Sequence, residues 1–251
     1  MNLFDLKGRV AVITGGNGGI GLGMARGLAA CGARVVIAAR DEAKNAAALA
    51  ELGEHAIAIH ADLTAPGAAE RLMAHVLDQA GRLDILINNA GTNRRVRPEL
   101  VSDADWAAVL DINLTALMRM SRAAHPALAA SGRGRIVNIG SMLSLFGMPF
   151  SPAYAASKGA VVQYTKACAT AWATDKITVN AILPGWIDTE LTQGARRDVP
   201  TLNDAVLART PMKRWGDPSD FAGIAAFLVS DSAKFVTGTS IAVDGGFSVQ
   251  G

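Results

Sequence analysis

Short apolar runs alternate with longer alanine-rich segments along the whole chain. Seven of the runs are rich in β-branched residues and have the length expected of buried strands. They lie at Val10–Ile13, Arg34–Ala39, Ala56–His60, Ile85–Asn88, Arg135–Ile139, Thr178–Leu183 and Ser240–Val243. The segments between them favour helices, and this alternation is typical of βαβ units that cover a parallel sheet on both faces. We therefore predict an α/β fold of the Rossmann type, with a doubly wound, seven-stranded parallel sheet.

One stretch after the sixth predicted strand interrupts the alternation. It runs from Trp186 to Gly216, is rich in polar residues and contains Pro200 and Pro211. Open α/β sheets bind ligands beyond the carboxyl ends of their strands, which is where this insertion begins. We predict one domain over residues 1–251, with a lid insertion at about 186–216. A purely structural helical excursion is the alternative.

Composition restricts the classes of partner. With 251 residues and 50% hydrophobic content, the chain can bury a substantial core. Its 24 basic and 22 acidic residues give a formal charge of +2, so we expect no nucleic-acid partner. No apolar run approaches the roughly 18 residues of a membrane span, and the first residues are too few and too charged for a secretory signal. We predict a cytoplasmic protein with no membrane partner.

Cysteine usage gives no sign of a metal site. Cys31 and Cys168 are the two cysteines of the chain, and neither shows the spacing of a metal ligand. We expect buried thiols, no disulfide and no metal.

A glycine-rich turn follows the first predicted strand and precedes a helix-forming segment. Glycines allow left-handed backbone conformations and let a pyrophosphate approach the N-terminus of a helix. Two spacings fit a dinucleotide-binding turn. One is formed by Gly16, Gly18 and Gly21, and the other by Gly15, Gly19 and Gly21. A structural loop without a ligand is the alternative.

Tyr154 and Lys158 lie four positions apart, a spacing that places both side chains on one face of a helix. A free tyrosine has a pKa near ~10, but a phenol beside a fixed positive charge ionises more easily and can exchange protons with a substrate oxygen. The pair therefore suits the interconversion of alcohols and ketones. A surface pair without chemistry is the alternative.

The segments Thr14-Gly15-x-x-x-Gly19-Ile20-Gly21 and Tyr154-x-x-x-Lys158, in this order, resemble the short-chain dehydrogenase/reductase family. Further matches extend along the chain: Asn88-Asn89-Ala90-Gly91 after the fourth strand, Asn113, Ser141 thirteen residues before Tyr154, Pro184-Gly185 after the sixth strand, and Val243-Asp244-Gly245-Gly246. Within the family the chain looks most like bacterial sugar-acid dehydrogenases of the gluconate and deoxy-ketogluconate type and like 3-oxoacyl reductases.

This resemblance implies an NAD(P)-dependent enzyme that interconverts a secondary alcohol and a ketone by hydride transfer. Tyr154 would exchange the proton, and Lys158 would lower the pKa of Tyr154 and hold the nicotinamide ribose. Ser141 would orient the reacting oxygen, and Asn113 would hold a water that links Lys158 to solvent. A protein that binds the dinucleotide as a sensor without turnover is the non-enzyme alternative, against which these four intact residues argue.

Further cofactor contacts are implied by the resemblance. They are Gly15, Asn17, Gly19, Ile20, Gly21, Asp62, Leu63, Asn89, Ala90, Gly91, Pro184, Gly185, Ile187 and Thr189, together with Tyr154 and Lys158. An NAD enzyme places a carboxylate at the end of the second strand, where it would repel a 2′-phosphate. Here Ala39 and Arg40 stand at that point, and a guanidinium can grip a phosphate. NADP(H) is therefore favoured over NAD(H), although Asp41 leaves NAD open.

The substrate is less constrained. Arg94, Arg95 and Arg97 form a basic cluster that could bind a carboxylate, which favours a sugar acid or polyol. We assign Ser141, Arg94, Arg95 and Trp186 to the substrate site. A solvated loop or an intersubunit contact is the alternative for the arginines. Apolar side chains could instead line a pocket for a 3-oxoacyl thioester or a cyclic ketone; they are Met142, Leu143, Phe146, Met148 and Phe150.

Two helical segments suggest an assembly. Trp106–Ala130 and Ala155–Ala173 are apolar on more than one face, whereas a helix that covers one side of a sheet needs one apolar stripe. In the family these segments pair across a two-fold axis, and a second interface near the carboxyl terminus completes a tetramer. We expect a homotetramer, with a dimer as the alternative.

Overall fold

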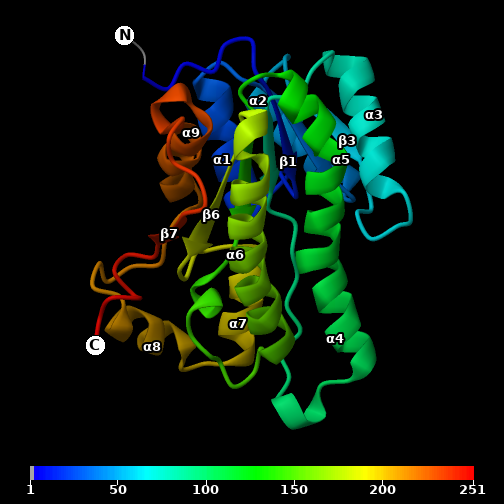
Figure 1. Ribbon diagram of the computed structural model, residues 1–251. Helices are drawn as coiled ribbons and strands as arrows, with labels where there is room; N and C mark the ends of the chain where they lie inside the picture. Colours follow the sequence, from blue (N-terminus) through cyan, green and yellow to red (C-terminus); the bar gives the residue numbers. More distant parts are fainter. Residues whose placement is uncertain (1–2) are drawn as a thin grey trace.

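The computed structural model describes residues 3–251 and contains one parallel sheet (Figure 1). Its strands are β1 (Val10–Thr14), β2 (Arg34–Ala39), β3 (Ile57–His60), β4 (Ile85–Asn88), β5 (Arg135–Ile139), β6 (Thr178–Pro184) and β7 (Ser240–Val243). They lie side by side in the order β3-β2-β1-β4-β5-β6-β7, and every pair is parallel. The predicted doubly wound, seven-stranded fold is confirmed. The predicted strand boundaries are displaced by one residue at Thr14, Ile57 and Pro184.

Alternate residues of each central strand face two separate cores. Val10 and Val12 of β1 pack in one core, and Ala11 and Ile13 pack in the other. Every residue of β1 and β5 is buried, because helices cover both faces of the sheet. This arrangement explains why the strands are continuous apolar runs in the sequence.

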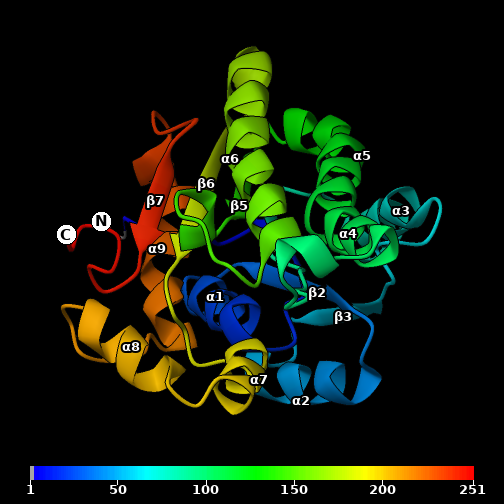
Figure 2. The same ribbon diagram turned by 90° about the horizontal axis from the view of Figure 1, so that it is seen from below.

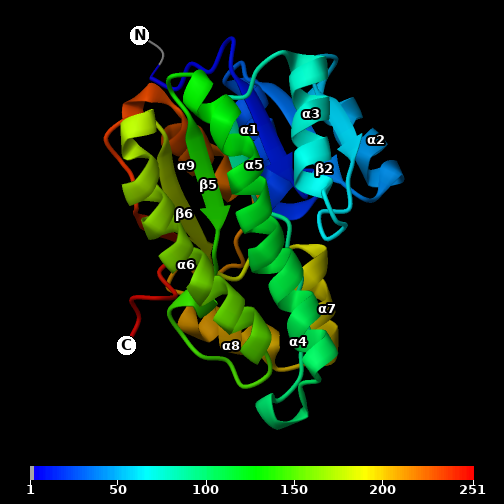
Figure 3. The ribbon, with the colours of Figure 1, turned by 45° about the vertical axis from the view of Figure 1, so that its right-hand side comes forward.

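Two helical layers enclose the sheet (Figure 2). One core lies between the sheet and α3 (Ala68–Ala80), α5 (Ala116–Ala130) and α6 (Pro152–Trp172), which Figure 3 shows in front of the strands. The other lies between the sheet and α1 (Gly19–Ala30), α2 (Glu42–Leu52) and α9 (Ala222–Val229). The strand order reverses between β1 and β4, and in such sheets the ligand crevice opens at this point, beyond the carboxyl ends of the strands.

The remaining helical elements lie in the connections. They are α4 (Asp103–Leu110), α7 (Glu190–Asp198), α8 (Leu202–Arg209) and the short 3₁₀ turns Pro98–Leu100, Met142–Ser144, Ala173–Asp175, Pro218–Phe221 and Asp231–Ala233. Between α4 and α5, residues Asp111–Thr115 form a π-helical turn. The predicted helical segment from Trp106 is therefore present, but it changes its hydrogen-bond spacing around Asn113.

The predicted lid insertion is helical and lies beyond the carboxyl ends of the strands, where α7 and α8 are visible in Figure 1. Its two ends meet, because Ile187 bridges to Gly216 and the amide of Asp188 donates to the carbonyl of Gly216 over 2.8 Å. The lid therefore leaves and rejoins the sheet at one point.

A chain of buried polar side chains joins the sheet to α5 and α6. Asn88 Nδ2 donates to Ser121 Oγ at 3.0 Å and to Asn138 Oδ1 at 2.9 Å. Asn138 Nδ2 in turn donates to Thr165 Oγ1 at 3.0 Å. Asn138 and Thr165 are fully buried. Because buried polar groups are costly without partners, this chain of bonds fixes how the two helices sit on β4 and β5.

Candidate active site

The glycine-rich turn between β1 and α1 has a backbone conformation and close contacts that favour glycine. Gly15 and Gly19 have φ values of 62° and 49°, in the left-handed region. A Cβ atom on Gly21 would lie 2.3 Å from the carbonyl oxygen of Gly15, so only glycine fits there. No side chain caps the N-terminus of α1, so its first amide groups are available to a ligand. Of the two predicted spacings, the wider one contains the positive-φ glycines.

Hydrogen bonds between the end of β1 and the loop after β4 hold this turn in place. Thr14 Oγ1 accepts hydrogen bonds from the amides of Asn89, at 3.0 Å, and Ala90, at 3.1 Å. Asn89 Nδ2 donates to the carbonyls of Thr14 and Gly15, both at 3.0 Å. The structure thus brings together the glycine turn and the Asn89-Ala90-Gly91 segment, which are distant in the sequence.

A cleft of about 940 Å³ opens beside the turn, at the carboxyl ends of β1, β2 and β3. Seven of the predicted cofactor-binding residues line it: Gly15, Asn17, Arg40, Asp62, Leu63, Ala90 and Gly91. Residues that the sequence analysis did not assign to the cofactor site also line it, among them Lys44, Thr92, Arg94, Asp111 and Ile112. Lys44 could have been found, because it follows Arg40 by four residues at the start of a helix.

Charged groups gather at the β2 end of this cleft. Asp41 caps α2, and its carboxylate accepts from the amide of Lys44 at 3.0 Å. One of its carboxylate oxygens is therefore engaged in capping α2, although Asp41 also lines the cleft. Hydrogen bonds from Thr64, aided by the charge of Arg40, hold the pKa of Asp62 below its usual value. Asp62 therefore stays ionised beside Arg40.

Helix α6 carries Tyr154 and Lys158, and the loop after β5 carries Ser141. Lys158 is buried, and its Nζ donates to the carbonyl of Ile139 at 2.7 Å and lies 5.6 Å from the centre of the Tyr154 ring. Ser141 forms a side-chain hydrogen bond with Tyr154. Ser144 Oγ donates to the carbonyl of Lys158 at 2.8 Å, which ties the loop to the helix. Three predicted catalytic residues therefore converge.

Burial dominates the protonation of this pair. It lowers the pKa of Lys158 from 10.5 to about 8, because the charged ammonium loses its hydration. Burial also raises the pKa of Tyr154, and the hydrogen bond with Ser141 opposes this only in part. The expected lowering of the Tyr154 pKa by Lys158 therefore does not dominate, because burial of the phenol has the larger effect.

Asn113 lies in the π-helical turn and is fully buried. Its Oδ1 accepts from the amide of Thr92 at 2.8 Å, and its Nδ2 donates to the carbonyl of Thr92 at 2.9 Å and to Ser157 Oγ at 3.0 Å. A Cβ on Gly91 would lie 3.1 Å from Asn113 Oδ1 and 3.7 Å from Lys158 Nζ, so Asn113 and Lys158 flank the same glycine. The side chain joins the loop after β4 to α6, a contact that the sequence analysis missed.

The predicted residues after β6 lie at the base of the lid. Pro184 pairs with Val243 of β7, and Ile187 is buried. Thr189 is the N-cap residue of α7 and packs against the glycine turn, since its Cγ2 lies 3.2 Å from the place of a Cβ on Gly19. This contact brings the start of α7 next to the turn.

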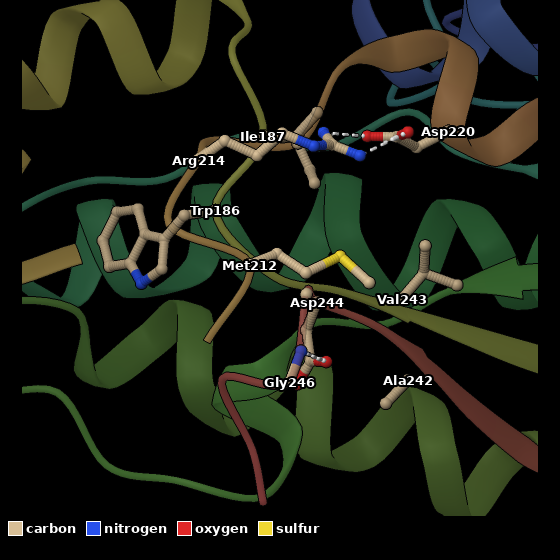
Figure 4. Close-up of a pocket in the computed structure, with 11 residues that line it drawn as sticks. Trp186, Ile187, Met212, Arg214, Asp220, Ala242, Val243, Asp244 and Gly246 are labelled. Atoms are coloured by element: carbon tan, nitrogen blue, oxygen red, sulfur yellow. Dashed lines mark hydrogen bonds and ion pairs between the residues drawn. The ribbon is translucent and has the colours of Figure 1, made fainter. Parts of the chain in front are cut away.

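Trp186 faces a second cavity, of about 400 Å³, between the base of the lid and the end of β7 (Figure 4). Its ring meets the ring of Trp215 edge to face, with centres 5.7 Å apart. Figure 4 shows Arg214 and Asp220 facing each other beside this cavity, joined by hydrogen bonds of 2.7 and 2.9 Å. Trp186 is thus placed where the two ends of the lid meet.

The predicted arginine cluster separates into three contacts. Arg95 Nη2 donates to the carbonyl of Leu191 at 2.7 Å, and its Nη1 lies 3.3 Å from Asp198, so Arg95 binds α7. Arg94 lines the cofactor cleft and lies 3.7 Å from Asp105. Arg97 pairs with Glu99 on the surface. The three guanidinium groups do not converge on one anion site.

Within residues 3–251, no three or more histidine, cysteine or acidic side chains are placed to hold a metal ion. No helix in this part of the chain is both long and apolar enough to cross a membrane.

A parallel sheet with a glycine turn at its switch point, beside a Ser–Tyr–Lys constellation, defines a dinucleotide-dependent oxidoreductase of the α/β class. A family model described as "Enoyl-(Acyl carrier protein) reductase" matches residues 15–248. The chain belongs to the short-chain dehydrogenase/reductase family, and its resemblance to that family is confirmed.

Proteins similar to this chain match it over nearly its full length. A 2-dehydro-3-deoxy-D-gluconate 5-dehydrogenase of Escherichia coli is 39% identical over 98% of each chain. A galactitol 2-dehydrogenase (L-tagatose-forming) of Cereibacter sphaeroides is 41% identical, also over 98% of each chain. The crystal structure of a gluconate 5-dehydrogenase from Burkholderia cenocepacia, in complex with NADP and tartrate, superposes with a TM-score of 0.93 at 37% identity, covering 99% of this chain and 98% of the other.

Proposed function

We propose that this protein is an NADP(H)-dependent dehydrogenase that interconverts a secondary alcohol of a sugar acid or polyol and the corresponding ketone. The observation that carries this proposal is the convergence of Ser141, Tyr154 and Lys158 near the dinucleotide cleft. The relatives named above act on sugar acids and a polyol, and one binds NADP, which supports the substrate class and the cofactor.

The cleft fits a nicotinamide dinucleotide. The positive-φ glycines and uncapped amides of α1 would hold the pyrophosphate, Arg40 the 2′-phosphate, and Asp62 with Leu63 the adenine. At the other end Lys158 would bind the nicotinamide ribose. The contacts at the carboxamide end would come from Pro184, Gly185, Ile187 and Thr189. When bound, the nicotinamide supplies or accepts the hydride.

Tyr154 would donate the proton to the substrate oxygen in reduction and accept it in oxidation. Its raised pKa keeps the phenol protonated near neutral pH, so the acid form is available for ketone reduction. Ser141 would bond the same oxygen and orient it. Lys158, with a pKa of about 8, stays mostly charged at pH 7 and can bond the ribose while remaining near the phenol.

Asn113 would take part in the proton path through a water. Its two amide hydrogens are engaged by Thr92 and Ser157, so the side chain can offer only the second lone pair of Oδ1. The main-chain carbonyl of the π-helical turn is the other group of this residue that could accept a hydrogen bond from the water.

Two of the apolar side chains after β5 pack together. Met142 is buried in a core cluster, and Phe146 packs against that cluster and stacks on Arg209 of α8 at 5.2 Å, whereas Phe150 is exposed. A 3-oxoacyl thioester or a cyclic ketone therefore stays the alternative substrate, and the relatives favour a sugar acid or polyol.

The test is a turnover screen of the purified protein with NADP⁺ and NAD⁺ against sugar acids, polyols, cyclic alcohols and 3-hydroxyacyl thioesters. The variant Tyr154→Phe serves as the blank. We expect turnover with a sugar acid or polyol, and faster with NADP⁺. Turnover confined to acyl thioesters or cyclic alcohols would favour the alternative substrates. Dinucleotide binding without any turnover would favour the sensor.

The homotetramer, the single domain and the cytoplasmic location are further proposals. Phe235 and Val249 are 99% and 83% exposed near β7 and the carboxyl terminus, where apolar side chains support a second interface. The edge strand β7 supports the same interface, because an open edge favours pairing with another chain. The free thiols of Cys31 and Cys168 are compatible with a reducing compartment.

A further inference from the structure

An ion pair joins the cofactor cleft to the lid. Lys44 lies in the first turn of α2, and Glu190 is the first residue of α7, the first lid helix. Lys44 Nζ donates to the two carboxylate oxygens of Glu190 at 2.8 and 2.6 Å. The side chains are 44% and 78% exposed, so a solute can reach both of them.

Lys44 also faces the part of the cleft where the second ribose would lie. It lines the cleft with Arg40, Asp41 and Asp62, at the end of β2. A 2′-phosphate brings between one and two further negative charges to this point, as a phosphate monoester does. Without Lys44, Arg40 would be the one cation near that phosphate on the side of β2, and the carboxylates of Asp41 and Asp62 would repel it. Lys44 is the second cation that lines this cleft on the side of β2.

We propose that Lys44 is a specificity-determining contact for the 2′-phosphate of NADP(H), and that Glu190 holds Lys44 until that phosphate binds. The inference rests on the NADP(H) preference proposed above. A lysine on a flexible stem can turn from the carboxylate of Glu190 to a phosphate in the same cleft. NAD(H) lacks the phosphate and leaves the ion pair intact.

The transfer of Lys44 affects one end of the lid helix. On the other side, Arg95 holds α7 through the carbonyl of Leu191 and the carboxylate of Asp198. Arg95 does not line the cleft, so the 2′-phosphate does not compete for it. The side chain of Glu190 is therefore released when NADP(H) binds, whereas the contacts of Arg95 with Leu191 and Asp198 persist. NADP(H) and NAD(H) would thus differ in their effect on the lid, because only NADP(H) breaks the ion pair between Lys44 and Glu190.

The test uses 2′,5′-ADP and 5′-AMP as probes, because they differ only in the phosphate and carry no nicotinamide. Titration calorimetry at low salt should show that Lys44→Met weakens 2′,5′-ADP binding about threefold to tenfold and changes 5′-AMP binding less than twofold. Lys44→Arg should retain the preference. Glu190→Gln should tighten 2′,5′-ADP binding about twofold to fivefold, as the loss of an exposed competing pair would.

A matched control is the ion pair between Arg26 of α1 and Glu51 at the other end of α2. Glu51→Gln removes an exposed carboxylate from the same helix, away from the cleft. It should leave the affinities for both probes within twofold. Glu190→Gln should not change the affinity for 2′,5′-ADP in the Lys44→Met background, because Glu190 and the phosphate then no longer compete for an ammonium group.

Hydrogen exchange gives a readout that is independent of turnover. Binding of 2′,5′-ADP should speed exchange at the start of α7 in the wild-type protein, and 5′-AMP should not. Equal effects of Lys44→Met on both probes, or unchanged exchange in α7, would overturn the inference. Turnover with NADP⁺ in the wild-type protein is measured separately. If the wild-type protein turns over with NADP⁺ but Lys44→Met does not change 2′,5′-ADP binding, the inference fails and the proposed function stands. If no alcohol is oxidised, the proposed function fails.

Discussion

The buried ammonium of Lys158 should make the stability of the protein depend on pH in a defined way. Its pKa falls from 10.5 to about 8 on folding, because burial removes its hydration. The unfolded chain therefore binds a proton more tightly than the folded chain between these values. Stability consequently rises as pH increases from about 8 to 10.5, and the full contribution is roughly 3 kcal/mol, since each pKa unit corresponds to about 1.4 kcal/mol.

The measurement is urea unfolding of the wild-type protein and of Lys158→Met between pH 7 and pH 10, at one protein concentration. Methionine is unbranched and one atom shorter than lysine, and it removes the titrating group. It also leaves the carbonyl of Ile139 without its hydrogen bond, a loss of roughly 1–3 kcal/mol that does not vary with pH.

We expect the wild type to gain roughly 2–3 kcal/mol relative to Lys158→Met over this range, since part of the titration lies above pH 10. Lys166 is exposed on the same helix, and Lys166→Met should follow the wild-type profile. A constant difference between wild type and Lys158→Met at every pH would refute the reasoning, because the ammonium would then be as well solvated in the folded protein as in the unfolded chain.

Four other outcomes are expected. Tyr154→Phe should bind dinucleotide within a few-fold of wild type but lower turnover by at least ~10², the contribution of a positioned acid; near-normal turnover in stopped assays would contradict this. Arg40→Ala should weaken NADP(H) by roughly 1.5–3 kcal/mol and spare NAD(H) in fluorescence titrations, unless Arg40 is only a surface charge. Arg95→Ala should raise KM for neutral and anionic substrates alike, because it loosens α7, whereas an effect confined to anions, for Arg95→Ala or Arg94→Ala, would show a substrate contact. Light scattering should return four times the 26.0 kDa chain mass, and a monomer at micromolar concentration would exclude the tetramer.

The strands and the spacing of the site residues could be predicted from the sequence. Parallel strands buried on both faces are continuous apolar runs, so β1 and β5 are visible as such. The glycine turn and the Tyr154–Lys158 pair depend on spacing within one segment. Such local signals do not need knowledge of the tertiary structure.

Contacts between distant segments could not be predicted in this way. The π-helical turn at Asn113 has no distinct composition, and its partners Thr92 and Ser157 come from other elements. The engagement of Arg95 with α7 requires knowledge of where the lid folds back. The direction in which the Tyr154 pKa shifts depends on burial, which is a property of the whole fold.

The chain of buried amides and hydroxyls beneath α6 sets the position of this helix independently of the loops and the lid. Asn88, Asn138 and Thr165 lock the rotation of α6 from below, so the direction of Tyr154 is set by groups that no substrate touches. Hydrophobic replacements could fill the same space, but they would allow α6 to adopt several rotations about its axis. A proton donor transfers its proton less efficiently when its orientation varies. Changes in the loops and the lid would therefore leave the orientation of the Tyr154 phenol intact, because that orientation is set in the interior.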